Sequence, residues 1–287
     1  MRPSCAVREI GRRAHAALVA SEGHVDRSPG IDASSYAFAH GEPIYIARTV
    51  ATMHPRTVIV DAGERPSPGE RIDVAHLTPW NHGYSTSGNA SMATLRSACE
   101  AVTRSLSQLP DPPGFARLLV GAVPEFPLDR VFPHVSALAA AIDAGDAGSI
   151  YTASLALLGL GHGLTPSGDD LVGAALFARR VLLPSASGWA GSATMTTDLI
   201  AAARQRTHPI SAALFADLVA GESFAPLHRL AAAFESGVED EIGIAARELM
   251  GIGHSSGFDM LTGFVIGIAG CAALPPDVAG FSHGGTP

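Results

Sequence analysis

The sequence predicts an α+β fold in which a β-rich N-terminal domain, residues 1–120, precedes an all-helical domain, residues 121–287. Two changes of pattern support this division. Between residues 31 and 80, short apolar segments alternate with clusters of Gly, Pro and Asp, which is typical of an antiparallel sheet or a small barrel. After Pro133, apolar residues recur at helical spacing. We expect the boundary to lie between Pro110 and Pro133.

The individual elements follow from the same patterns. The expected strands are SYAFAH, IYIAR, RTVIVDA and RIDVAHL. Apolar residues spaced by three and four predict a helix from Ser91 to Leu109, which the segment QLPDPPG ends. The later helices are expected at HVSALAAAIDAG, SIYTASLALLGLG, DDLVGAALFARRVLL, TDLIAAARQR, SAALFADLVAG, PLHRLAAAFESG, EDEIGIAARELMG and DMLTGFVIGIAG.

Composition excludes several classes of function. The net charge is −8 and the chain has no basic run, so we expect no binding to nucleic acid. All 19 basic residues are arginines. The lack of lysine rules out Schiff-base chemistry, pyridoxal phosphate held on an amine, and a P-loop lysine. An anion would have to be bound by arginine, by backbone N–H groups or by a metal ion.

The cysteine pattern and hydropathy predict a cytoplasmic protein. Cys5, Cys99 and Cys271 are far apart and form no C-x-x-C motif, as expected of reduced thiols. Arginines interrupt the first 23 residues, which therefore do not resemble a signal peptide. The longest uncharged apolar run, Met260 to Pro276, is shorter than the roughly 20 residues of a membrane span. We expect it to be a buried helix, with no membrane association.

The segment GLGHGLTPSGDD, residues 159–170, has a partial second copy. Gly159-Leu160-Gly161-His162 is echoed by Gly251-Ile252-Gly253-His254, and Ser167-Gly168-Asp169-Asp170 by Ser256-Gly257-Phe258-Asp259. Each copy ends one helix with glycines and begins another with Ser-Gly-x-Asp. The repeat predicts two helix N-termini related by an approximate two-fold axis and directed into one cavity.

Part of this motif is explained by helix capping alone. Ser167 is expected at the N-cap and Asp170 three residues later, as a capping box, and Ser256 with Asp259 repeats the device. Asp169 would add favourable charge at the positive end of the helix dipole. Capping requires neither the glycine-rich approach nor a second copy of the motif. These remaining features point to a binding site.

Three kinds of site fit the motif. Glycine-rich backbone before a helix N-terminus can bind a phosphate or carboxylate. Alternatively, Asp169 and Asp170 are candidate ligands of Mg²⁺ or another divalent cation, or a cation and an anion bind together. His162 and His254 occupy matched positions, either in the packing or in the site. No zinc-binding spacing occurs.

A second candidate region is AARQRTHPISAALF, residues 201–214. Arg204 and Arg206 end one predicted helix, and Ser211 lies near the start of the next. The arginines could simply offset a helix C-terminus. In a chain without lysine, Arg206 could instead bind a carboxylate or phosphate through its planar guanidinium group.

GLGHGLTPSGDDLVGA resembles the conserved block of the AllH-type family, named for a subunit of oxamate carbamoyltransferase, and RTHPISAALF and GIGHSSGFDMLTGF resemble its later blocks in the same order. The resemblance covers roughly residues 150–270. It implies a cytosolic component of a multi-subunit enzyme that transfers a carbamoyl group between oxalurate and phosphate, giving oxamate and carbamoyl phosphate in allantoin catabolism. At the fourth position of the first block, His162 stands where this family more often has Pro.

We therefore expect a subunit of a carbamoyltransferase-like enzyme, whose partners are small anionic substrates and the other subunits. The alternatives are a metal-dependent amidohydrolase-like enzyme, with the ion bound by His162, Asp169, Asp170, His254 and Asp259, and a non-catalytic scaffold. The predicted catalytic residues are Asp169 and Asp170. The predicted anion-binding residues are Gly161, Gly163, Thr165, Ser167, Gly168, Arg206, Ser211, Ser256, Gly257 and Asp259.

Overall fold

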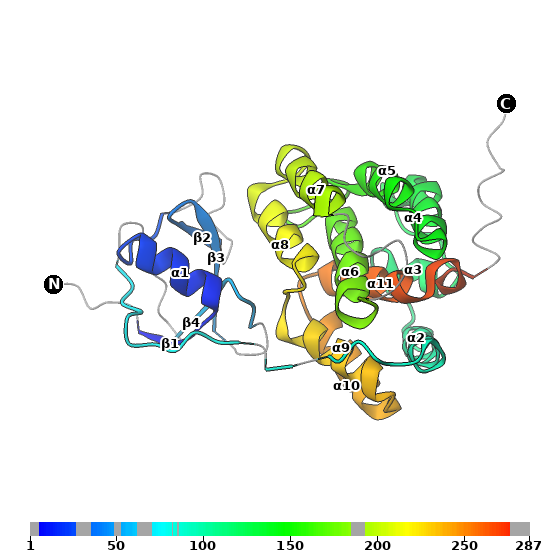
Figure 1. Ribbon diagram of the computed structural model, residues 1–287, viewed down its shortest axis with the longest axis horizontal. Helices are drawn as coiled ribbons and strands as arrows, with labels where there is room; N and C mark the ends of the chain where they lie inside the picture. Colours follow the sequence, from blue (N-terminus) through cyan, green and yellow to red (C-terminus); the bar gives the residue numbers. More distant parts are fainter. Residues whose placement is uncertain are drawn as a thin grey trace. The chain divides into compact units, whose positions relative to one another are not determined.

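The computed structural model (Figure 1) describes residues 6–26, 36–48, 53–61, 71–81, 83–84, 86–184 and 193–275. It confirms the α+β class, with a small sheet in the N-terminal region and helices from residue 92 onward. The chain forms two compact units. The first consists of residues 1–83 and 222–228, and the second of residues 84–221 and 229–287.

The sheet of the first unit has four strands in the order β1-β4-β3-β2. The strands are β1 Val7–Ile10, β2 Tyr36–Ala39, β3 Glu42–Ala47 and β4 Thr57–Val60. β1 pairs with β4 and β2 with β3 in antiparallel fashion, but β3 and β4 are parallel. The predicted purely antiparallel sheet is therefore wrong. RIDVAHL is not a strand either, because within it only Arg71 pairs, in an isolated bridge with His24.

The helix α1, Arg12–Ala20, follows β1 and was not predicted. Its buried side chains, Ala14, Ala17 and Leu18, pack with the apolar residues of the sheet. The helix begins without a capping side chain; the backbone N–H groups of Arg13 and Ala14 instead donate to the carbonyl of Pro55. Tertiary contact thus replaces the local signal by which a helix start is recognised in a sequence.

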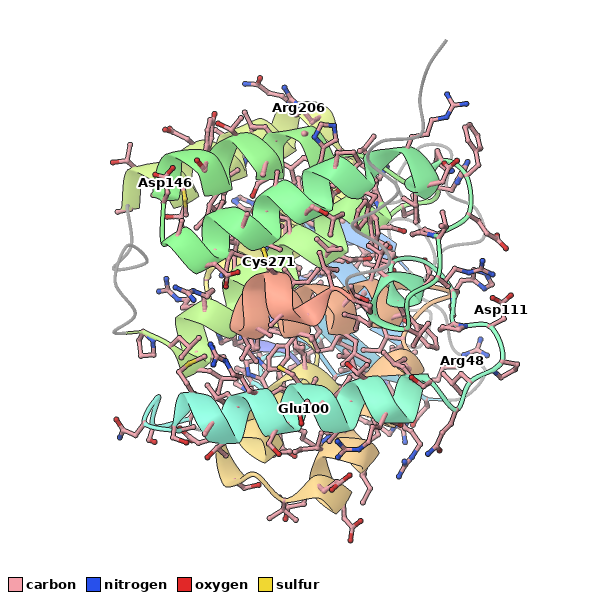
Figure 2. All side chains as sticks on the ribbon, turned by 90° about the vertical axis from the view of Figure 1, so that its right-hand side faces the viewer. Arg48, Glu100, Asp111, Asp146, Arg206 and Cys271 are labelled. Atoms are coloured by element: carbon pink, nitrogen blue, oxygen red, sulfur yellow. The ribbon has the colours of Figure 1, made fainter. Side chains whose placement is uncertain are left out.

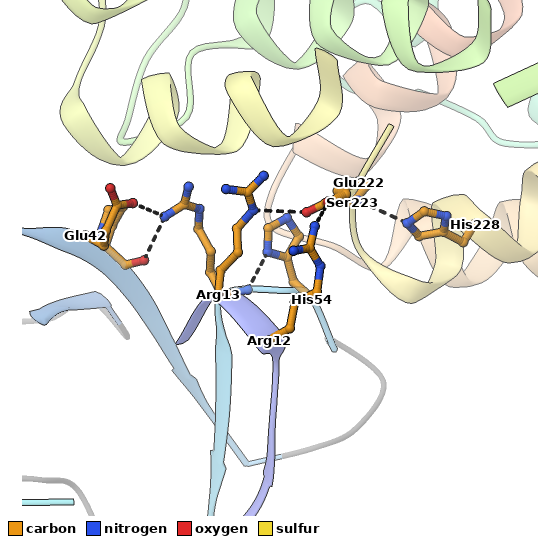
Figure 3. Close-up of polar contacts among 9 residues, drawn as sticks. Arg12, Arg13, Glu42, His54, Glu222, Ser223 and His228 are labelled. Carbon is orange, nitrogen blue, oxygen red and sulfur yellow. Dashed lines mark hydrogen bonds and ion pairs between the residues drawn. The ribbon is translucent and has the colours of Figure 1, made fainter. Parts of the chain in front are cut away.

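The segment Glu222–His228 joins the first unit although it is distant in the sequence. Figure 3 shows Arg12 and Arg13 reaching the carboxylate of Glu222, with 3.0 Å between Arg13 Nε and Glu222 Oε2. The backbone N–H of Ala225 donates to the carbonyl of Met53 at 2.8 Å. Ion pairing and backbone hydrogen bonding therefore both hold this segment in the sheet unit.

The second unit is helical. Its elements are α2 Met92–Leu106, α3 Ala116–Leu119, η2 Leu128–Val131, α4 Phe132–Ala144, α5 Ala147–Leu157, α6 Ser167–Leu182, α7 Ala193–Arg206, α8 Pro209–Val219, α9 Ala225–Ser236, α10 Glu239–Met250, α11 Ser256–Ala269 and η3 Gly270–Ala273; the first turn of α9 belongs to the sheet unit. The helix predicted at Ser91–Leu109 is α2, and the Ser91 hydroxyl caps it by accepting from Thr94 N.

The two units divide the chain after Gly83, not at the predicted boundary near residue 120. The difference comes from α2. Its buried face, which includes Leu95, Ala98 and Val102, packs on α10 and α11 and not on the sheet. A proline-rich segment after a helix therefore does not mark the domain boundary in this chain.

The centre of the helical unit is the pair α6 and α11, which Figure 1 shows with the other helices around it. The backbones touch at two glycines: a Cβ at Gly263 would lie 1.9 Å from the carbonyl oxygen of Leu171, and one at Gly267 would lie 2.4 Å from that of Ala175. The contact advances four residues along both helices. The helices therefore run in the same direction, and their N-termini lie at the same end.

The stretch Ser256–Ala273, which comprises α11 and η3, is long and apolar enough to cross a membrane by length and composition. However, 72% of it is buried inside the protein. This is the pattern of a core helix, as the sequence predicted for the run from Met260 to Pro276. Most of that run is the helix that packs against α6.

Candidate functional site

A cavity of about 640 Å³ lies at the N-terminal ends of α6 and α11. Three chain segments line it: residues 111–128 around α3, the loop before α6, and the loop before α11. Both copies of the repeat contribute, because Gly161, His162 and Ser167 face the same space as their counterparts Gly253, His254 and Ser256. The repeat thus forms two sides of one pocket.

Ser167 and Ser256 are the first residues of their helices and not the N-caps that the sequence predicted. Pro166 and Ser255 occupy the cap positions, and neither helix has a side-chain cap. The two serines instead bridge the helices. Ser167 hydrogen-bonds to Asp259 of the other helix, and Ser256 to Asp170. The expected capping boxes are therefore wrong, because each serine serves the opposite helix.

A further contact joins the two loops at the pocket surface. The hydroxyl oxygens of Thr165 and Ser256 lie 2.9 Å apart. Gly161 and Gly163 give the first loop its shape, with φ angles of 123° and 93° that disfavour other residues. A Cβ at Gly161 would also lie 2.6 Å from Ser167 N. Four predicted residues, Gly161, Gly163, Thr165 and Ser167, thus line one side of the pocket.

Asp170 and Asp259 form a buried carboxyl pair beneath the serines. Asp170 is 6% exposed and Asp259 is fully buried. Burial raises the pKa of Asp170 well above its usual value, and the nearby charge of Asp259 raises it further. Burial also raises the pKa of Asp259, to about 6. Two carboxyl groups this close in a dry site cannot easily both ionise.

Each of these carboxyl groups keeps one oxygen without a hydrogen-bond partner. The atoms are Asp170 Oδ2 and Asp259 Oδ2. The other oxygen of Asp259 accepts from the backbone N–H of Phe115 at 2.8 Å. A Cβ at Gly114, where φ is 61°, would lie 2.3 Å from that oxygen. Glycine at position 114 therefore lets the 111–117 segment approach the pair.

Asp169 does not point into the pocket, and a catalytic role for it is not supported. Its Oδ1 accepts from the backbone N–H of Gly159 at 2.7 Å. Its Oδ2 accepts from the hydroxyls of Thr207 and Ser211, the latter at 2.6 Å. With 1% exposure and three donors, this carboxylate connects the glycine loop to the start of α8.

Three other predicted anion-binding residues are already engaged within the fold. Ser211 is buried and donates to Asp169. The backbone N–H of Gly168 donates to Leu160 O, and that of Gly257 donates to Ile252 O. Gly168 and Gly257 are matched in the repeat, and a Cβ at either would lie 1.9 Å from a carbonyl oxygen of an earlier helix. Their role is close packing.

The arginine of the pocket is Arg117, and the sequence gave no indication of it. The predicted Arg206 is exposed and donates from Nη1 to the carbonyl of Leu155, near the end of α5, at 2.6 Å. Figure 2 shows Arg206 at the top of the helical unit and Asp111, a pocket residue, at its right-hand side. Arg117 lies in α3 and pairs with Asp111 and Glu125. Only its place after the glycine of PDPPG could have suggested its role.

The described ranges contain no group of three or more His, Cys, Asp or Glu residues arranged to hold a metal ion. Because both oxygens of Asp169 accept hydrogen bonds, Asp169 and Asp170 do not form the expected Mg²⁺ site. His162 and His254 line the pocket and do not complete an ion site with the carboxyl pair. The metal-dependent alternative has no support here.

Comparison with known proteins identifies the region that contains the pocket loops. Residues 157–268 match the family model described as oxamate carbamoyltransferase subunit AllH, which confirms the resemblance seen in the sequence. The match includes both helix N-termini but neither Arg117 nor the sheet. No curated protein and no solved structure shows a significant match to the chain.

Proposed function

We propose that this chain is a subunit of an oxamate carbamoyltransferase-like enzyme and that the pocket at the N-termini of α6 and α11 binds its small anionic substrates. The proposed reaction transfers a carbamoyl group between oxalurate and phosphate, with oxamate and carbamoyl phosphate as products. Its partners are the other subunits of the enzyme. Its place is the cytoplasm, in the breakdown of ureides such as allantoin.

The observation that carries this proposal is the convergence of two helix N-termini on one cavity inside the matched region. Each N-terminus bears about half a positive charge, and backbone N–H groups there favour phosphates and carboxylates. Two helices that run in the same direction add these fields. A protein that has no lysine and a net charge of −8 can bind small anions in this way.

Arg117 supplies the full positive charge of the pocket. Its side chain is 20% exposed, whereas those of its partners Asp111 and Glu125 are 66% and 81% exposed. Ion pairs with such exposed carboxylates contribute about 1 kcal/mol or less. A substrate carboxylate or phosphate could therefore replace them on the guanidinium group, whose planar fork suits both anions.

The proposed chemistry matches these groups. Attack of phosphate on the carbamoyl carbon places negative charge on the carbonyl oxygen, and fixed dipoles stabilise such charge without reorganisation. The reaction needs neither an amine nor an organic cofactor. The glycine-rich loop at Gly161 and Gly163, the hydroxyl of Thr165 and the two serines surround the space where it would occur.

Ligand-dependent stability tests the proposal directly. Carbamoyl phosphate, phosphate or oxamate should raise the Tm of the purified full chain in a saturable manner, because a ligand that binds only the folded state stabilises it. Arg117→Gln should weaken this effect by at least about tenfold in apparent Kd. The matched control is Arg206→Gln, which removes an arginine outside the pocket and should leave the effect unchanged.

Two results would contradict the proposal. One is the absence of saturable stabilisation by any of the three anions, both in the isolated chain and in the complex reconstituted with its partner subunits. That result would favour the scaffold alternative. The other is an equal loss of affinity in the Arg117 and Arg206 variants, because a general charge effect, and not the pocket, would then explain binding.

A further inference from the structure

The pocket contains two groups for which anion binding provides no role, Asp170 and Asp259. Both are more than nine-tenths buried, and each keeps an unpartnered oxygen. Their only side-chain links toward the cavity are Ser256 and Ser167, both of which line it. Burying two adjacent carboxyl groups is unfavourable, so their presence under a pocket requires an explanation.

We propose that Asp170 and Asp259 together hold one proton and exchange it with the substrates through the two serine hydroxyls. This inference rests on the proposed carbamoyl transfer. A serine hydroxyl can donate and accept at once, so it can pass a proton between a buried carboxyl group and a bound molecule. The approximate two-fold symmetry provides two such routes, one on each helix.

The proton balance of the reaction matches this arrangement. Hydrogen phosphate attacks the carbamoyl carbon, a C–O bond forms, and the phosphate hydroxyl gives up its proton. The C–N bond to oxamate breaks, and the amide nitrogen keeps the electron pair and must gain a proton. The reaction therefore takes one proton from oxygen and delivers one to nitrogen, with no net release.

A pair that holds one proton can perform both steps. The ionised carboxylate accepts the proton of the phosphate through its serine, and the protonated carboxyl group gives its own to the leaving nitrogen through the other serine. The pair again holds one proton after each turnover. In this scheme Ser167 and Ser256 contact the substrates, and the two aspartates are positioning residues that act through them.

The surroundings of the pair favour the singly protonated state. Among described residues, the charged groups facing it are Asp169 in α6 and, around the cavity, Arg117, Asp111 and Glu125. His162 and His254 line the same cavity. Burial is the largest influence on the pKa of both carboxyl groups and raises it. Repulsion between the two carboxylates then keeps the second proton bound.

Kinetics of the reconstituted complex test this role. Asp170→Asn and Asp259→Asn should each lower kcat by about 100-fold or more, the range typical of lost acid–base catalysis, with a much smaller change in KM. The wild-type pH profile of kcat should be bell-shaped, and each variant should lose one limb. A purely structural role would lower the rate without removing a limb. Asp143→Asn, which alters an exposed carboxylate that accepts from Cys271 N, should keep the wild-type profile.

Infrared spectroscopy of the isolated full chain provides a measurement that needs no turnover. The difference spectrum between the wild type and the Asp170→Asn/Asp259→Asn double variant should show a protonated carboxyl C=O band at about pH 7. Only carboxylate bands at that pH would overturn the inference. So would variants with wild-type kcat and pH profile, or about one divalent metal ion per chain bound at the pair.

The two proposals fail in different ways. If no anion binds and no carbamoyl transfer occurs, the proposed function fails even if the infrared band is present. If transfer occurs at the wild-type rate in both Asn variants, the function stands and the shared proton is wrong. Circular dichroism shows whether each variant is folded, and Ser256→Ala, which breaks one route while keeping both carboxyl groups, replaces any variant that is not.

Discussion

The substitution Asp259→Asn should stabilise the protein at neutral pH and have little effect in acid. In the folded state burial raises the pKa of Asp259 from 3.8 to about 6. The folded protein therefore binds a proton more tightly than the unfolded chain does. The free energy of unfolding consequently falls as pH rises from about 4 to about 6, because the unfolded chain loses its proton first.

The pKa shift sets the size of this effect. A change in pKa from 3.8 to about 6 corresponds to about 3 kcal/mol, at about 1.4 kcal/mol for each pKa unit. Asparagine carries no charge at any pH, and its side-chain oxygen can still accept from Phe115 N. The variant should therefore unfold with a free energy about 1 to 3 kcal/mol higher than that of the wild type at about pH 8, and a similar one at about pH 4.

Urea denaturation followed by circular dichroism at several pH values measures this difference. The decisive quantity is the change with pH in the gap between variant and wild type, because the amide's own packing cost is the same at every pH. A gap that does not change between about pH 4 and about pH 8 would refute the argument. It would mean that Asp259 ionises in the fold as readily as it does in water.

Three further predictions concern stability and are checked by the same denaturation experiment. Asp169→Ala should cost about 3 to 5 kcal/mol, because it leaves three buried donors without their acceptor. Gly263→Ala should cost about 1 to 3 kcal/mol or more, because its Cβ would lie 1.9 Å from the carbonyl oxygen of Leu171. Asp146→Ala should destabilise at neutral pH and less in strong acid, because hydrogen bonds from residues 148 and 149 lower the pKa of the Asp146 carboxyl.

The sequence predicted the helical unit well because its signals are local. The helix α2 shows apolar spacing and a capping serine, and the repeat at residues 159 and 251 correctly placed two helix N-termini at one cavity. The sheet unit was predicted less well. The parallel pairing of β3 with β4 and the addition of Glu222–His228 depend on contacts between distant residues, which leave no periodic pattern.

The roles within the motif were harder to predict, because adjacent residues on a helix face different directions. Asp169 and Asp170 are neighbours, yet one is hydrogen-bonded by Gly159, Thr207 and Ser211 while the other has an unpartnered oxygen near Asp259. A helix turns about 100° between successive residues, so only one of the two can face α11. Local sequence does not say which.

The close packing of α6 on α11 explains how both the pocket and the carboxyl pair arise. Glycines at 263 and 267 allow the two backbones to touch, so the N-termini lie side by side and each serine reaches the aspartate of the other helix. The same closeness excludes water from the carboxyl groups, which raises their pKa. Stability alone would favour uncharged residues there, since buried ionisable groups cost free energy. We therefore regard the pair as retained for function, in line with the general conflict between stability and activity at functional sites.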